Sequence, residues 1–392
     1  MSIRGRAAIV GFGELPTLRT YGERSALGLM AQVTRIAIDD ARIKHDDIDA
    51  VITGPRISAV TVSQALGLRP KYTASMSAMG ASGATSIIHA AMVVASGVAS
   101  TVLCVFSEAQ PKSSAAAFAA AARSGPPSLG SEWEAPFGPA VAANTGWGHI
   151  TQRHMFEYGT KPEQIAKVVV DERWSAMLNE NAVWKGVPVT LDDVLASRFV
   201  NDPLHLLECT MPCAAAFAVI VTTPERAHSL PNPPVYILGV GGPSQRHDQL
   251  WQDEQITTTP VAISAPSALR MAEYSIGEID FVQCYDGYAM TAMVTLEDAG
   301  VCPKGESGNF YQSTDTTYKG AFPVNTDGGQ LGAGWPGGGG TAGFRHVIEG
   351  TRQLMRRAGV RQVERADLAL INGCGGIASV MSTVILGSAD AL

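Results

Sequence analysis

The chain has 392 residues, of which 46% are apolar and 17% charged, and its formal net charge is −7. This composition predicts an enzyme-like protein with large buried cores, and it argues against a nucleic-acid-binding surface or a polybasic membrane anchor. No apolar run approaches the ~20 residues that a membrane span needs, and the N-terminal residues lack the continuous apolar segment of a signal peptide. We therefore expect a cytoplasmic protein with no membrane span and no nucleic-acid partner.

The six cysteines are spread along the chain without a CxxC pair. This spacing indicates neither a disulfide framework nor a zinc site, and we expect most of the thiols to be buried. The sequence predicts no bound metal ion and no bound cofactor.

Taken in chain order, the predicted elements occur twice. Helix-like patterns at 26–41 and at 264–275 separate apolar, strand-like runs, which predicts an α/β fold with mostly parallel sheets covered by helices on both faces. Three pairs of strand-like runs recur in the same order along the chain: 7–13 with 235–242, 47–52 with 278–283, and 99–106 with 366–373.

This repeat divides the chain into a half at 1–230 and a half at 231–392. The first half carries a long excursion at about 107–215, which we expect to supply a lid or a substrate-binding surface. The second half carries an inserted loop at about 300–335.

Polar and glycine-rich runs adjoin apolar strands at three places. They are QCYDGY at 283–288, NTDGGQLGAGWPGGGGTAG at 325–343 and NGCGG at 372–376. Loops at strand ends are where α/β folds build their sites, so these runs hold the candidate site residues. The glycine run that begins at Gly337 lacks the Lys-Ser/Thr that follows it in a nucleotide P-loop.

In these runs the chain resembles the thiolase superfamily, and within it the sterol-carrier-protein-x-like or lipid-transfer-protein-like thiolases. The most specific matches are YDGYAMTAMVTLEDAGVCPKGESGNF, PVNTDGGQLGAG and NGCGG, and the resemblance covers nearly the whole chain. It implies a five-layer αβαβα architecture with two pseudo-symmetric halves, a homodimer, and an acyl-CoA substrate. Coenzyme A would thus be part of the substrate rather than a bound cofactor.

Two catalytic positions of the family have lost their usual residues. The nucleophilic cysteine, whose thiolate a helix N-terminus would stabilise, falls on Gly80. Ser82 is the nearest hydroxyl, but a serine in a glycine turn more often caps a helix. The family's Gly-His-Pro turn reads Gly334, Trp335, Pro336, and an indole cannot shuttle a proton at neutral pH. True thiolase activity is therefore not expected.

Tyr285 and Cys374 remain as the main catalytic candidates. Tyr285 stands where the family has Asn or His, and Cys374 matches the C-terminal cysteine of a CxG turn. Some relatives that lack the nucleophile are retro-aldolases for β-hydroxyacyl-CoA in steroid side-chain degradation, with a tyrosine at the Tyr285 position, although the tyrosine is not exclusive to them. A retro-aldol cleavage needs no covalent nucleophile. We expect Tyr285 to transfer the β-hydroxyl proton, and Cys374, or water near it, to reprotonate the enolate.

Other residues of the three runs are assigned to supporting roles. The thioester oxygen would be held by backbone N–H groups of the 332–338 turn or of the helix start at 80–84. Tyr288 is a further catalytic candidate, but local packing is the alternative for both tyrosines, and Asp286 could simply fix its turn. The predicted substrate-binding set is Gly80, Ser82, Asp286, Gly334, Trp335 and Gly337.

Two other functions stay open from the sequence. One is an acyltransferase or thiolase-like subunit of a multi-protein complex, and the other is a non-catalytic subunit that binds an acyl chain or lipid. The resemblance also implies a partner protein with an OB-fold and a zinc ribbon, which would join the homodimer in a heterotetramer.

Overall fold

The structure is a computed structural model, and it describes residues 2–109, 142–246, 253–337 and 340–392. Part of the predicted excursion, 110–141, and two residues of the glycine run, 338–339, lie outside the described residues. The strands of the main sheet are β1 (Ala8–Leu18), β2 (Ala50–Thr53), β3 (Tyr72–Ser75), β4 (Thr101–Glu108), β7 (Ala214–Thr222), β8 (Val235–Gln245), β9 (Phe281–Gln283), β10 (Leu368–Gly375) and β11 (Val380–Gly387).

The helices fall into three groups by position in the chain. In the first half they are α1 (Ala26–Ala41), α2 (Ala59–Leu66) and α3 (Ser82–Ala95). The excursion holds α6 (Ala142–Tyr158), α7 (Pro162–Ala176) and α8 (Leu191–Ala196), with the short strands β5 (Phe199–Asn201) and β6 (Leu204–His205) and then α9 (Pro224–Ala227) after β7. The second half has α10 (Val261–Ala272), α11 (Ala289–Ala299), α12 (Ser307–Ser313), α13 (Gly329–Ala333) and α14 (Thr341–Leu354).

The strand order shows the internal repeat directly. The order is β3-β2-β4-β7-β1 in the first half and continues as β8-β11-β10-β9 in the second. Val324 forms a parallel bridge to Val282 of β9, so the segment around Val324 takes the place that β3 has in the first half. The two half-sheets meet through a short antiparallel contact, in which Ala8 and Ile9 pair with Tyr236 and Val235.

The expectation of mostly parallel sheets was wrong. Among the named strands of the main sheet, the parallel pairs are β2 with β3 and β4, and β9 with β10. The remaining main-sheet pairs, including β1–β7, β4–β7, β10–β11 and β8–β11, are antiparallel. Apolar strands indicate burial on both faces, and here helices cover both faces of antiparallel pairs as well, so composition does not report strand direction.

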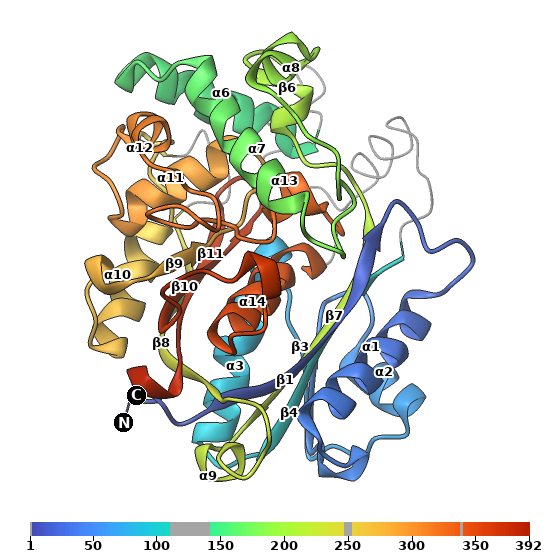
Figure 1. Cartoon of the computed structure of the whole chain (residues 1–392). Coiled ribbons are helices and arrows are strands. Elements are labelled where there is room, and N and C mark those ends of the chain that lie inside the picture. The colour runs from blue at the N-terminus through green and yellow to red at the C-terminus, as the bar shows by residue number, and fades with distance from the viewer. Residues whose placement is uncertain (1, 110–141, 247–252, 338–339) are drawn as a thin grey trace.

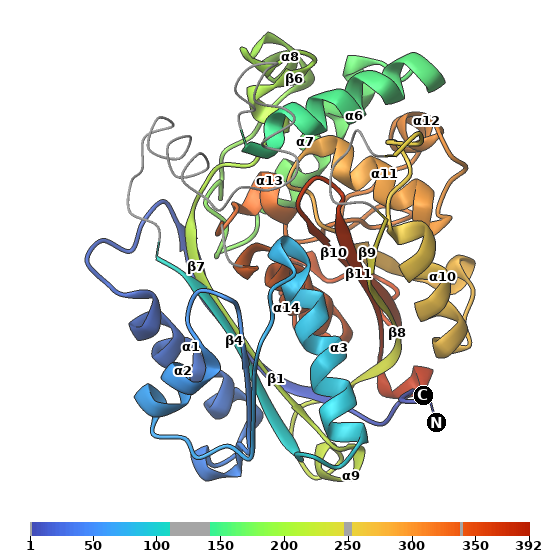
Figure 2. The same cartoon turned by 180° about the vertical axis from the view of Figure 1, so that it is seen from behind.

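The layers stack as helix, sheet, helix, sheet, helix, which confirms the predicted fold class. Helices α1 and α2 cover the outside of the first half-sheet, and α10 and α11 cover the outside of the second (Figure 1). Helices α3 and α14 pack against each other between the two half-sheets (Figure 2). Because they are enclosed by both sheets, nearly all of their residues are buried.

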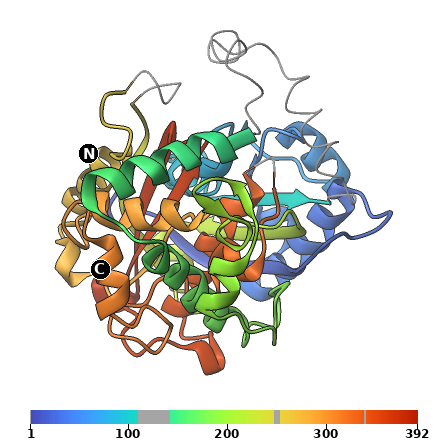
Figure 3. The ribbon, with the colours of Figure 1, turned by 90° about the horizontal axis from the view of Figure 1, so that it is seen from above.

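The excursion lies across one end of these layers. Helices α6 and α7 lie at the top of the molecule in Figure 1 and face the viewer in Figure 3, and α7 packs on α11, α12 and α13. The excursion therefore covers the helices that follow β9, from α11 to α13. The division of the chain at 230 and 231 stays a prediction. No helix in the described part of the chain is long and apolar enough to cross a membrane.

Candidate active site

Tyr285 and Trp335 are brought together by loops from two different elements. Tyr285 lies in the loop between β9 and α11, and Trp335 follows the end of α13. The indole Nε1–H of Trp335 donates a hydrogen bond of 2.9 Å to the phenol oxygen of Tyr285. Since that oxygen already accepts a hydrogen bond, the phenol proton is left to be donated elsewhere.

The main chain holds Trp335 in place on both sides. Its backbone N–H donates to the carbonyl of Met211 at 3.1 Å, and its carbonyl accepts from the N–H of Cys213 at 2.8 Å. Both partners belong to the segment that leads from the excursion into β7. The excursion thus fixes the residue that contacts Tyr285.

Gly80 and Cys374 lie against the same tyrosine. Gly80 is in the 3-10 turn Met79–Ala81 that precedes α3, and Cys374 is on β10. A Cβ atom placed on Gly80 would lie 2.2 Å from the carbonyl oxygen of Cys374 and 2.5 Å from Cε2 of Tyr285. The structure therefore gathers Gly80, Tyr285, Trp335 and Cys374 into one site, although they are far apart in sequence.

Burial keeps the acidic groups of this site protonated at neutral pH. The pKa of Tyr285 is raised above its ordinary value of 10, chiefly by burial, and the hydrogen bond from Trp335 lowers it only in part. Burial also raises the pKa of the Cys374 thiol to about 12. Both residues are therefore proton donors, and neither is an ionised base at rest.

Asp286 fixes the Tyr285 loop to the start of α13. Its Oδ2 accepts hydrogen bonds from the backbone N–H groups of Gln330 at 2.6 Å and Leu331 at 2.9 Å. Its Oδ1 lies 3.3 Å from Nε2 of His346. These contacts are those of a residue that holds its turn, which was the alternative left open by the sequence.

His346 is a neighbour of Tyr285 that the sequence did not predict as a site residue. It is fully buried on α14, and its ring centroid lies 6.2 Å from that of Tyr285. Its Nε2 is 3.0 Å from the side-chain nitrogen of Gln330. The usable signal was a histidine one turn into the helix that follows the glycine run.

A second buried network approaches from the excursion. The amide of Asn325 donates to Oε1 of Glu172 on α7 at 2.7 Å and accepts from the backbone N–H of Cys284 at 2.9 Å. Burial and the neighbouring Asp286 raise the pKa of Glu172 well above 4.5. A protonated Glu172 removes the repulsion between its carboxyl group and that of Asp286.

Tyr288 faces the excursion. Its hydroxyl donates to Oδ1 of Asn144 on α6 at 2.6 Å, and its ring stacks on Trp147 with centroids 5.7 Å apart. Burial raises its pKa, with smaller contributions from Cys209 and Tyr285. These contacts are those of the packing alternative, in which the hydroxyl is bonded locally.

The remaining predicted substrate-binding residues lie close to Trp335 or to the start of α3. Ser82 is fully buried, and its hydroxyl accepts from the backbone N–H of Ala78 at 2.9 Å. Gly334 has a left-handed backbone, with φ of 102°, and donates its N–H to the carbonyl of Gln330. A Cβ on Gly337 would lie 2.4 Å from the indole ring of Trp335.

Four of the backbone donors expected for a thioester oxygen are already engaged. The N–H groups of Gly332, Gly334 and Trp335 donate to backbone carbonyls, and so does that of Ala81. The turn after α13 forms hydrogen bonds within itself and with the segment that leads into β7, and a sequence pattern cannot show such bonds. These four amides are therefore not free to form the predicted oxyanion site.

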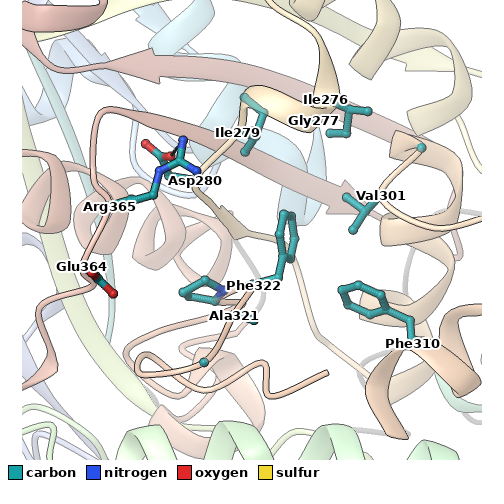
Figure 4. Close-up of a pocket in the computed structure, with 13 residues that line it drawn as sticks. Ile276, Gly277, Ile279, Asp280, Val301, Phe310, Ala321, Phe322, Glu364 and Arg365 are labelled. Atoms are coloured by element: carbon teal, nitrogen blue, oxygen red, sulfur yellow. Dashed lines mark ion pairs between the residues drawn. The ribbon is translucent and has the colours of Figure 1, made fainter. Parts of the chain in front are cut away.

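A separate pocket of about 500 Å³ opens at the other end of β9. Figure 4 shows Phe310 and Phe322 on one side of it and the ion pair of Asp280 with Arg365 on the other. Asp280 also accepts hydrogen bonds from the backbone N–H groups of Asp367 and Leu368. The carboxylate in this wall is thus already paired, and Tyr285 does not line the pocket.

Among the described residues, no group of three His, Cys, Asp or Glu side chains is placed to hold a metal ion.

Comparisons with known proteins place the chain in a family. Residues 242–388 match the family "Thiolase C-terminal domain-like". An acetyl-CoA acetyltransferase of Methanothermobacter thermautotrophicus is 32% identical over 360 residues, which are 88% of this chain and 90% of that protein. A steroid side-chain-cleaving aldolase of Thermomonospora curvata is 29% identical over 395 residues, 98% of each chain.

The solved structure described as "Ltp2-ChsH2(DUF35) aldolase" superposes with a TM-score of 0.87 at 27% identity, and the match covers 98% of each chain. The five-layer fold agrees with this structural match, and the acetyltransferase is 32% identical over most of both chains. This chain belongs to the thiolase superfamily.

Proposed function

We propose that this protein is a retro-aldolase, which cleaves the Cα–Cβ bond of a β-hydroxyacyl-CoA to a ketone or aldehyde and a shortened acyl-CoA. The observation that carries the proposal is the hydrogen bond from Trp335 to Tyr285 beside Gly80. The protonated phenol thus lies beside Gly80, the position that carries the nucleophile in the family. The similarity to a steroid side-chain-cleaving aldolase supports this reaction and suggests a steroid side chain as the acyl group.

Acyl transfer through a thiolate is disfavoured by the state of every cysteine. All six lie in the described part of the chain, and burial raises each thiol pKa above its ordinary value of 9.0. A covalent acyl-enzyme needs a thiolate at a helix N-terminus, and Gly80 leaves that position without a side chain. Thiolase activity is therefore not proposed.

The protonated phenol suits a reaction in which one proton moves within the substrate. In retro-aldol cleavage the β-hydroxyl proton leaves oxygen, the Cα–Cβ bonding pair becomes the enolate, and Cα gains a proton. We place Tyr285 between these two atoms. Its oxygen accepts the hydroxyl proton and its own proton goes to Cα, so the phenol is neutral before and after.

Trp335 and Cys374 have supporting roles in this scheme. The Trp335 N–H stabilises negative charge that develops on the phenol oxygen during the transfer. The Cys374 thiol remains protonated and can donate a weak hydrogen bond to the thioester enolate. Tyr288 and Asp286 act through position, since the first is bonded to Asn144 and the second holds the start of α13.

We propose that the chain works in an assembly with a subunit of the kind named in its structural relative. That relative is an aldolase with a ChsH2(DUF35) component. A homodimer of this chain with two OB-fold and zinc-ribbon subunits would form a heterotetramer. Purifying the chain alone and with such a partner, and comparing masses by light scattering, tests this assembly.

The reaction is tested by incubating the purified chain, with and without its partner, with a β-hydroxyacyl-CoA that carries a steroid side chain. We expect a ketone or aldehyde and a shortened acyl-CoA in equal amounts. Tyr285→Phe should lower kcat by about 10²- to 10⁴-fold, the usual contribution of a positioned acid–base group. Tyr318→Phe is the control, because that ring stacks on Trp174 instead. Cleavage by Tyr285→Phe at the wild-type rate would show that the phenol is not the catalyst, and binding without cleavage would favour an acyl carrier.

A further inference from the structure

Two glycines approach the ring of Tyr285 from opposite edges. A Cβ on Gly80 would lie 2.5 Å from Cε2 and 2.6 Å from Cζ, and a Cβ on Gly287 would lie 2.8 Å from Cε1. Carbon atoms in contact are normally about 3.5 to 4.0 Å apart. Neither glycine has a positive φ, so backbone conformation does not require glycine at either position. The requirement is the space occupied by the ring.

The backbone around Gly80 leaves no other direction for a side chain. The Cβ position of Gly80 is 2.2 Å from the carbonyl oxygen of Cys374, which belongs to the buried strand β10. A Cβ on Gly343 would in turn lie 2.0 Å from the carbonyl oxygen of Gly80, so α14 packs directly on this turn. A side chain at residue 80 would therefore collide both with a central strand and with the phenol ring.

We infer that Gly80 and Gly287 are positioning residues that decide which reaction this site can perform. The inference rests on the proposed retro-aldol function and adds to it the residues that select that reaction. A side chain at residue 80 and the Tyr285 ring compete for the same space. The phenol can reach Trp335 only because residue 80 carries no nucleophilic side chain. The site can therefore perform phenol-mediated proton transfer or covalent acyl transfer, but not both.

The expected effect of filling this space is large because the phenol must move. Restoring a normal contact to a new methyl group requires a shift of the ring by about 1 Å. A displacement of that size in a reacting group can cost about 100-fold in rate. Gly80→Ala and Gly287→Ala should each lower kcat by about 100-fold and change KM much less. Gly277→Ala is the matched control, since a Cβ there has no heavy atom within 4 Å, and its kcat should equal that of the wild type.

A double-mutant cycle separates positioning from general damage. If Gly80 acts through the Tyr285 hydroxyl, Gly80→Ala should cost little further rate once Tyr285→Phe has been introduced. If the same factor were lost with and without the hydroxyl, the inference would be overturned. Thermal unfolding of each variant beside Gly277→Ala shows whether the fold is intact, and Gly287→Ala tests the inference independently if Gly80→Ala does not fold.

A structural readout keeps the inference distinct from the proposed reaction. Should the wild type cleave no β-hydroxyacyl-CoA, the proposed function fails, while a crystal structure of Gly80→Ala still tests the competition for space. A Tyr285 ring displaced from Trp335 supports the inference. A ring that keeps its place and its hydrogen bond beside the new methyl group overturns it.

Discussion

At Tyr285, two opposing influences set the protonation state of the phenol. Burial disfavours the phenolate, and the Trp335 N–H favours it, with burial the larger of the two. The direction of the net shift matters because a raised pKa means that the phenol enters the reaction with a proton to pass to Cα, whereas a lowered pKa would give a phenolate base. The sequence could name this tyrosine, but it could not supply the sign of the shift.

This sign makes a prediction for the pH dependence of the reaction. The phenol should stay protonated until well above its ordinary pKa of 10, so kcat should be level between pH 7 and 9 and fall only under more alkaline conditions. Cys374, with a pKa of about 12, should not titrate in the level range either. A profile of kcat against pH measures this dependence. An increase of kcat with a midpoint below pH 9 would show instead that Tyr285 works as a phenolate base.

Among the elements, α6 and α11 are joined by a buried contact between a histidine and a carboxylate, which attaches the excursion to the second half. His154 on α6 lies 2.9 Å from Glu297 on α11, and both side chains are fully buried. Glu297 also accepts from the hydroxyl of Ser307 at 2.6 Å and lies 3.2 Å from Nζ of Lys304. This attachment matters for the site because α6 also carries Asn144, the partner of Tyr288.

The buried carboxylate of Glu297 predicts how the stability of the fold depends on pH. Burial alone would raise the pKa of Glu297, but His154 and Lys304 outweigh it and lower the pKa from 4.5 to about 2. The stability gained from the ionised carboxylate is therefore complete above pH 4.5 and is lost as the pH falls toward 2. Over this pH range, we expect the free energy of unfolding of the wild type to fall by on the order of 3 kcal/mol more than that of Glu297→Gln.

Urea unfolding at a series of pH values provides the measurement. Asp39→Asn is the control, because Asp39 is exposed and should leave the acid dependence of wild type unchanged. Equal acid slopes for wild type and Glu297→Gln would contradict the assignment of Glu297 as an ionised, paired carboxylate.

At the scale of the whole molecule, a buried network of charges connects the two halves. Arg345 of α14 lies 3.1 Å from Asp327 and 3.9 Å from Glu14 of β1. Arg352, which lies on the same helix, pairs with both Glu14 and Glu349. Because α14 is enclosed by both half-sheets, these charges are desolvated and must be paired. The network fixes the central helix that carries His346 and Gly343 beside Tyr285.

Removing one partner of this network should be costly. Arg345→Met keeps much of the side-chain volume but leaves Asp327 without its guanidinium, and we expect the free energy of unfolding to fall by about 3 to 5 kcal/mol. Arg35→Ala is the comparison, since the Arg35–Asp39 pair is exposed and its loss should cost less than about 1 kcal/mol. Chemical denaturation measures the free energy of unfolding of both variants. Similar losses for the two variants would show that the buried network adds no more than a surface pair.

The duplicated α/β architecture followed from the sequence because it depends on local patterns. Apolar strand-like runs and helical spacing recur in the same order in both halves, and the predicted family and fold class are confirmed. Strand direction was misjudged, since strands buried on both faces have similar compositions whether they are parallel or antiparallel. The roles assigned to single site residues stay predictions.

By itself, the sequence determined that Gly80 and Trp335 replace the usual cysteine and histidine, and that Tyr285 and Cys374 remain. Only the tertiary structure decided that the indole donates to the phenol, that the amides of the 332–335 turn are occupied, and that the Tyr285 ring fills the space beside Gly80. The physical reason is that the sequence directly specifies only the type of residue at each position. Desolvation, hydrogen-bond partners and excluded volume arise only when segments distant in sequence pack together.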